Sequence, residues 1–121
     1  MAGPFAISTD EHGIVGVVAT GFWSPADLQG HFGELKKAID AARARIGIAR
    51  VLVDLRASSV QSKDIFERCG EATSAIYDAE DRIAIVAEST LLTMQMRRLD
   101  AAAGRAAFTD PAEARGWLLS A

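Results

Sequence analysis

A polar loop in the middle of the chain holds the side chains best suited to chemistry. Asp54 ends an apolar run, and Ser58, Ser59 and Ser62 follow it before a segment with helical spacing begins. A carboxylate at the carboxyl end of a parallel strand can face a ligand crevice, although such a group more often accepts hydrogen bonds from a neighbouring loop. A loop serine can also be a phosphorylation site. Phosphate would switch binding there, because it adds about two negative charges. Alternatively, the Ser62 hydroxyl can cap the helix that follows, and local chemistry favours this cap.

The histidines and the cysteine do not form a pattern that predicts catalysis. His12 falls in a turn between two apolar runs, and His31 is expected to be an exposed residue of the first helix. Cys69 shares an apolar stripe with Ile65 and Ile76, so we expect a buried, unreactive thiol. A zinc site needs ligands at short paired spacings and a phosphate loop needs a glycine-rich pattern, and the sequence contains neither. It therefore predicts no catalytic residue, no metal site and no cofactor.

Composition and charge exclude several classes of protein. Half of the residues are hydrophobic and the formal net charge is -3, with acidic and basic residues interspersed. A nucleic-acid surface needs a basic stripe, which this sequence lacks. The single cysteine excludes an internal disulfide, and the first residues do not resemble a signal peptide. The longest uncharged apolar stretch, 13–22, is too short to span a bilayer, so we expect one domain over residues 1–121 in a cytoplasmic protein.

Five apolar runs predict the strands of a mostly parallel sheet. A polar turn closed by Gly13 separates the first two runs, which is typical of a hairpin. The second run does not alternate with polar residues, so both of its faces are expected to be covered. The predicted strands are Phe5–Ile7, Ile14–Ala19, Val51–Leu55, Ile83–Ala87 and Arg105–Phe108.

Segments with apolar residues at helical spacing alternate with the later strands. Ser24 is expected to cap the first helix, with Pro25 at its first position and Gly47 at its end. Asp110 and Pro111 have the same two roles at the start of the last helix. Strands that alternate with helices form a mostly parallel sheet with right-handed crossovers.

The third predicted helix carries apolar residues on more than one face. Leu91 and Met94 lie beside the stripe that should face the core. There they can line a pocket or a subunit contact, although packing in the core explains them equally well. Ser89 or Thr90 is expected to cap this helix, and the core-facing stripe consists of Leu92, Met96, Leu99 and Ala103.

Four short motifs occur in a fixed order along the chain: GFWSPAD at 21–27, VLVD at 51–54, RIAIV at 82–86 and FTDPAEARGWL at 108–118. The last is the most specific, because an aromatic residue and a capped turn precede the pattern E-A-x-x-W-L. Together with the element order β-β-α-β-α-β-α-β-α, these motifs resemble the STAS domain, and most closely the SpoIIAA-like (STAS/SEC14-like) family of small bacterial proteins. The resemblance covers nearly the whole chain. It implies an α/β fold with a mixed, mostly parallel sheet of four or five strands packed with helices.

The resemblance also implies a class of function. SpoIIAA-like proteins resemble non-enzymatic binding or regulatory modules, and the SEC14-like label implies the alternative of a carrier or sensor for a small apolar, lipid-like ligand. Phosphorylatable STAS domains carry a short Asp-Ser-Ser-Gly-like motif in the loop after the middle strand. Here the matching segment is Gln61–Asp64, in which Lys63 stands where the phosphorylated serine is expected, so the pattern is broken.

The loops after the strands that end at Leu55 and Ala87 should leave the same end of the sheet. Open parallel sheets bind ligands and partners beyond the carboxyl ends of their strands. We therefore expect a protein partner or a small apolar ligand to bind there, and the sequence leaves a homodimer open. The residues predicted to form this surface are Asp54, Ser58, Ser62, Ser89, Thr90, Leu91 and Met94.

Overall fold

The computed structural model describes residues 3–88, 91 and 105–120. It confirms the α/β class, with a five-stranded mixed sheet in the order β1-β2-β3-β4-β5. The first pair of strands is antiparallel, and every later pair is parallel. The elements are β1 (Phe5–Thr9), β2 (Val15–Gly21), α1 (Pro25–Ile46), β3 (Arg50–Ser58), α2 (Lys63–Ile76), β4 (Arg82–Val86), β5 (Arg105–Phe108) and α4 (Pro111–Leu119).

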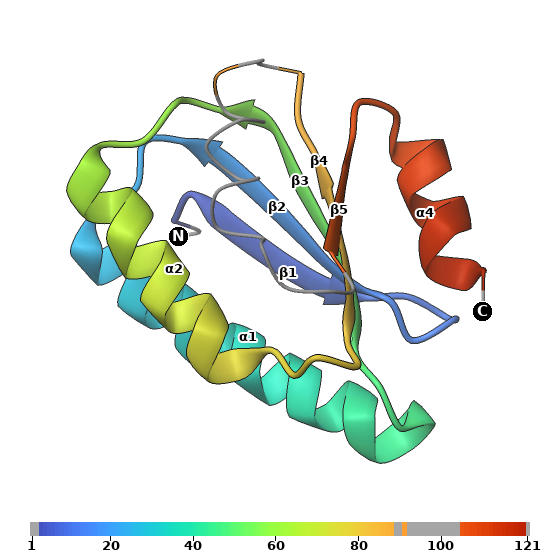
Figure 1. Cartoon of the computed structure of the whole chain (residues 1–121). Helices are drawn as coiled ribbons and strands as arrows, with labels where there is room; N and C mark the ends of the chain where they lie inside the picture. The colour runs from blue at the N-terminus through green and yellow to red at the C-terminus, as the bar shows by residue number, and fades with distance from the viewer. Residues whose placement is uncertain (1–2, 89–90, 92–104, 121) are drawn as a thin grey trace.

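Helices cover the two faces of the sheet unequally (Figure 1). The helices α1 and α2 lie on one face, and α4 lies on the other. The larger hydrophobic core fills the space under α1 and α2, where Leu35, Ile39 and Val51 are almost completely buried. A smaller core under α4 contains Ala84 and Leu118. Of the described helices, none combines the length and the apolar character needed to cross a membrane.

The strand β2 is covered on one face and open on the other. Its side chains alternate between buried and accessible, and Val18 is 46% exposed. The expectation that both faces of this strand are covered is therefore wrong. The physical reason is the position of α4, which packs mainly against β3, β4 and β5. The remaining predicted helix, including its stripe at 92–103, lies outside the described residues except for Leu91.

The helix ends predicted at Ser24, Gly47 and Asp110 are confirmed. Ser24 and Asp27 form a reciprocal capping box at the start of α1, and Gly47 ends that helix in the left-handed conformation at φ 89°. At α4, the Asp110 carboxylate accepts a hydrogen bond from the N–H of Ala112. Local chemistry alone determines these features, which is why the sequence could predict them.

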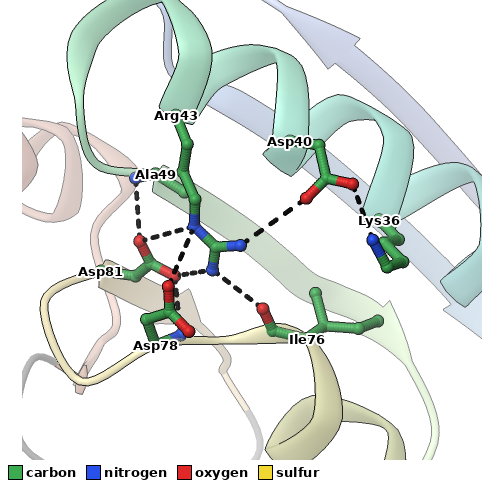
Figure 2. Close-up of polar contacts among 7 residues, drawn as sticks. All are labelled: Lys36, Asp40, Arg43, Ala49, Ile76, Asp78 and Asp81. Carbon is green, nitrogen blue, oxygen red and sulfur yellow. Dashed lines mark hydrogen bonds and ion pairs between the residues drawn. The ribbon is translucent and has the colours of Figure 1, made fainter.

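A buried ion pair joins the elements at the amino ends of β3 and β4 (Figure 2). The Arg43 guanidinium on α1 donates to the Asp81 carboxylate and to the carbonyl oxygen of Ile76, at the end of α2. Asp81 is 1% exposed and also accepts hydrogen bonds of 2.9 Å from the backbone N–H groups of Ala49 and Asp78. One carboxylate thus fixes α1, the end of α2 and the residues that lead into β3 and β4.

The environment of Asp81 keeps its carboxylate ionised. Burial by itself raises the pKa of Asp81, but the hydrogen bond from Arg43 and the two backbone N–H groups outweigh it, so the pKa lies below its usual value. The hydrogen bond to Asp81 likewise raises the pKa of Arg43, against the opposing effect of burial. Both partners therefore remain charged over the ordinary range of pH.

Candidate functional site

A buried glutamine holds the loops after β2 and β3 together. Gln61 is 6% exposed, and its Oε1 accepts a hydrogen bond of 3.0 Å from the N–H of Trp23. Its Nε2 donates to the carbonyl oxygens of Gly21 and Ser59, at 3.0 and 2.6 Å. Segments 21–23 and 59–61 therefore lie side by side. Sequence reasoning missed Gln61, because a glutamine in a polar loop carries no signal that it will be buried.

Exposed apolar side chains lie next to this braced segment. Phe22, after β2, is 73% exposed, and Val60, after β3, is 39% exposed. Leu91, which follows β4, is 66% exposed. Because β2, β3 and β4 are parallel, these residues follow the same end of the sheet. We call Phe22, Val60 and Leu91 the apolar rim. Single exposed apolar residues are common on protein surfaces, but a group of them at one end of a parallel sheet favours a binding surface.

Asp54 lies within β3 on the face that α4 partly covers, and Arg56 neutralises its charge. The guanidinium of Arg56 donates to both carboxylate oxygens, at 2.9 and 2.8 Å, and the Arg56 backbone N–H donates at 3.0 Å. These hydrogen bonds hold the pKa of Asp54 below its usual value. The pair borders a surface hollow that is also lined by Val18, Ala57 and Glu88. An ionised, paired carboxylate of this kind is suited to recognition and not to general acid catalysis.

The two serines of the predicted surface differ in their environments. Ser58 is the last residue of β3, and its buried hydroxyl has no hydrogen-bond partner within the described part of the chain. Ser62 caps α2, because its Oγ accepts a hydrogen bond of 3.3 Å from the N–H of Ile65. Asp64, in the first turn of α2, pairs with Arg68 at 3.0 Å. The interpretation of Ser62 as a helix cap is therefore confirmed.

Loss of this cap should destabilise the protein measurably. We expect Ser62→Ala to lower the free energy of unfolding by about 1 kcal/mol, because a backbone N–H of α2 loses its acceptor. Ser74→Ala is the matched control, since Ser74 is exposed within the same helix and alanine favours helix formation. Urea denaturation of the two variants and the parent provides the comparison. Equal midpoints for the Ser62 variant and the parent would contradict the capping role.

A small apolar cavity lies on the opposite side of the sheet, between the central strands, α1 and α2. Its volume is about 70 Å³. None of the described residues that line it carries a charge at neutral pH, given the low pKa of His31 described below. They are Phe5, Val17, Trp23, His31, Phe32, Leu35, Val53, Leu55, Cys69, Thr73, Tyr77, Ile83 and Ile85.

The expectation that His31 is exposed is wrong. It is 8% exposed and stacks on the Phe5 ring, with the ring centroids 4.0 Å apart. Positions 28, 31 and 35 of α1 face the sheet, so His31 falls between two buried leucines on the inner stripe. Burial lowers the pKa of His31 to about 4, so the imidazole is neutral at pH 7.

Cys69 is buried, as the sequence predicted, and its thiol is unreactive. Burial raises the pKa of Cys69 to about 12, which leaves almost no thiolate at neutral pH. Over the described residues, no three histidine, cysteine or acidic side chains lie close enough together to hold a metal ion. His12, the other histidine, lies in the turn between β1 and β2, where its backbone N–H donates to Asp10.

The structure brings some of the predicted site residues together and separates others. Ser58 and Ser62 lie on either side of the segment that Gln61 braces. Asp54 borders the hollow on the face of α4, whereas Ser62 begins α2, on the opposite face. Leu91 is exposed near the same end of the sheet. Ser89, Thr90 and Met94 lie outside the described residues.

Comparison with known proteins identifies the fold. Neither a protein-family model nor a curated protein sequence matches the chain. An uncharacterized protein of the DUF3478 family with a SpoIIAA-like fold, from Shewanella loihica PV-4, is similar at a TM-score of 0.64 and 19% identity, over 94% of this chain and 91% of that one. An anti-sigma factor antagonist from Mycobacterium paratuberculosis has a TM-score of 0.61 and 18% identity, over 94% and 92%.

The anti-sigma factor antagonist SpoIIAA in its unphosphorylated form is also similar, with a TM-score of 0.61 and 12% identity over 97% of this chain and 99% of that one. At such identities the likeness concerns the fold. The sequence motifs at 21–27, 51–54, 82–86 and 108–118 resemble the SpoIIAA-like family, so sequence and structure point to the same fold. The protein therefore has the SpoIIAA-like fold.

Proposed function

We propose that the protein is a non-enzymatic regulatory module that binds a protein partner through the apolar rim. The observation that carries this proposal is the braced pair of loops at Gln61, which holds Phe22 and Val60 exposed at the carboxyl end of the parallel strands. Two neighbours of the same fold are anti-sigma factor antagonists. The partner surface extends over the residues predicted from sequence, with Asp54, Ser58, Ser62 and Leu91 among the described ones.

The chemistry of the described residues supports a binding role. Cys69 is a buried thiol, His31 is neutral and stacked, and the Asp81 carboxylate is occupied by hydrogen bonds. Catalysis by a nucleophile and a base requires the two groups within hydrogen-bond reach of each other and of a substrate. Such a pair is not formed among the hydrogen bonds of the described residues, whereas recognition requires only exposed, rigidly held side chains.

Photo-crosslinking in the native host tests the proposal. A photoreactive phenylalanine analogue at position 22 should capture a specific partner protein, which mass spectrometry identifies. The same analogue at Leu119, an exposed apolar residue on α4, is the control. With the purified partner, Phe22→Ala should raise the Kd at least tenfold, as expected when an exposed aromatic anchor is removed, and Leu119→Ala should leave it unchanged. Equal effects of the two variants would refute the proposed surface, and capture of a second copy of the chain would assign the rim to a homodimer.

A second candidate function is that of a carrier or sensor for a small apolar ligand. The observation that favours it is the apolar cavity beneath α1 and α2. Native mass spectrometry of the purified protein distinguishes the two functions. A co-purifying small molecule favours the carrier, and a bare chain or dimer favours the protein-binding module.

A further inference from the structure

Hydrogen bonds at the two ends of β1 show which of its backbone groups face β2. In an antiparallel pair, residues that exchange hydrogen bonds with the partner strand alternate with residues whose N–H and C=O groups point away from it. The N–H of Thr20 donates to the carbonyl oxygen of Pro4, just before β1, and the N–H of Asp10, just after β1, donates to that of Ile14. The register between these two hydrogen bonds is continuous. The even-numbered positions of β1 therefore bond to β2, and the odd-numbered positions direct their backbone groups away from it.

Three residues of β1 thus present backbone N–H and C=O groups at the outer edge of the sheet: Phe5, Ile7 and Thr9. The strand β1 is the first in the sheet, and β2 is its only neighbouring strand among the described residues (Figure 1). Proteins usually protect such an edge with a charged side chain, a proline or a bulge. The strand FAIST contains no charge and no proline, and its pairing with β2 has no bulge. An edge of this kind is a template for a further strand.

A hollow borders this strand, between β1 and α1. Its volume is about 540 Å³, and its lining includes Phe5 and Ile7 from the strand and Ala26 and Gly30 from the helix. Both of these helical residues are small, and a Cβ atom added at Gly30 would find no atom of another element within 4 Å. The hollow therefore has room for the side chains of a strand that is added to β1.

The charges around the hollow admit an uncharged strand and oppose an acidic one. Among the described lining residues, the ionised ones are Asp27 and Glu34, because burial lowers the pKa of His31 to about 4 and leaves it neutral at pH 7. An acidic segment would therefore be repelled. Residues 3–9 of this chain carry no charge, so a second copy of β1 meets no such repulsion.

We propose that β1 pairs with β1 of a second copy of the chain, antiparallel and centred on Ile7. A two-fold axis at this position places Ile7 opposite Ile7 of the second copy and Phe5 opposite its Thr9, so every outward backbone group of these residues gains a partner. The five strands of each copy then form one continuous sheet, and neither β1 remains a free edge. Ile7 and Thr9 of the second copy point into the hollow beside α1. The inference goes beyond the proposed function and does not involve the apolar rim.

Hydrogen exchange at single amides tests this pairing. In the dimer the N–H groups of Phe5, Ile7 and Thr9 are hydrogen-bonded, whereas in a separate chain they face water. Dilution through the Kd of the dimer, measured by analytical ultracentrifugation, should raise the exchange rates of these three amides about tenfold or more. The N–H groups of Ala6 and Ser8 bond to β2 in either state, so their exchange rates are the internal control.

Two pairs of variants test the surface independently. Gly30→Tyr fills the hollow and should raise the Kd of the dimer about tenfold or more. Gly33→Tyr is the matched control, because Gly33 is also exposed on α1 with open space around an added Cβ, but it does not line the hollow. Ile7→Pro removes an outward N–H that β2 does not use and should weaken the dimer strongly. Ile7→Ala shortens the side chain and keeps that N–H, so it should weaken the dimer less.

Several results would overturn the inference. One is a parent chain that stays monomeric at a concentration of about 1 mM. A dimer with the same Kd in the two glycine variants would place the contact on another surface, and so would exchange rates at Phe5, Ile7 and Thr9 that do not depend on concentration. None of these results affects the proposed protein partner, which the crosslink at position 22 tests separately.

Discussion

Asp81→Ala should lower the free energy of unfolding by about 3–5 kcal/mol. The carboxylate is 1% exposed and accepts hydrogen bonds from Arg43 and from the backbone N–H groups of Ala49 and Asp78. Its removal leaves a partly buried guanidinium without its main partner and a buried N–H at Ala49 without an acceptor. Both losses add to the cost, because unsatisfied buried groups are more destabilising than missing contacts.

Asp40→Ala is the control for this experiment. Asp40 also approaches Arg43, at 3.7 Å, and pairs with Lys36 at 2.7 Å, but its side chain is half exposed. Solvent screens such pairs, so this variant should lose less than about 1 kcal/mol. Urea denaturation at pH 7 measures both variants under identical conditions. Similar losses for the two variants would show that burial of Asp81 contributes nothing to stability.

Acidification should destabilise the protein through His31 before it affects Asp81. The fold lowers the pKa of His31 from 6.5 to about 4, so between these values the unfolded chain binds a proton that the folded chain does not. Stability is therefore full above pH 6.5 and falls as the pH drops toward 4, by up to the order of 3 kcal/mol. The lowered pKa of Asp81 also makes the protein less stable in acid, but in a lower pH range. Its contribution to the free energy of unfolding is lost only as the pH falls below 3.8.

His31→Phe isolates the histidine contribution. Phenylalanine keeps a ring next to Phe5 and cannot titrate, so the stability of this variant should change much less between pH 7 and 4.5 than that of the parent. His12→Gln, in the turn between β1 and β2, is the control and should retain the slope of the parent. Unfolding free energies at several pH values supply the slopes. Parallel curves for His31→Phe and the parent would rule out a buried neutral imidazole.

Features that depend on neighbouring residues could be predicted from the sequence, and features that depend on distant ones could not. Three helices are capped by Ser24, Ser62 and Asp110. Each side-chain oxygen accepts a hydrogen bond from a backbone N–H two or three residues later, so local spacing predicts these roles. Asp81 lies in the polar stretch DAEDR and bonds to Arg43, which is 38 residues earlier. Nothing in the stretch itself distinguishes the buried carboxylate from its solvated neighbours.

The candidate site shows the same limit. The sequence placed Ser58 and Ser62 near one end of the sheet because strand direction is set by the alternation of strands and helices. It did not indicate that Gln61 braces the loops, or that His31 lies on the inner stripe of α1. The hydrogen bonds of Gln61 reach Trp23 and Gly21, 38 and 40 residues earlier. The position of His31 depends on the exact rotation of α1 against the sheet, which a spacing of three or four residues leaves uncertain by one position.

The strand order of the sheet has a consequence for how the protein is made. Because β1 to β5 lie in the same order in space and in sequence, the pairing partner of each new strand is the strand synthesised just before it. No later strand has to insert between two that are already paired. Every described residue of the larger core precedes residue 88, so all of them are synthesised before β5 and α4. The helix α4, which is synthesised after all five strands, closes the second face over Ala84 and Val86.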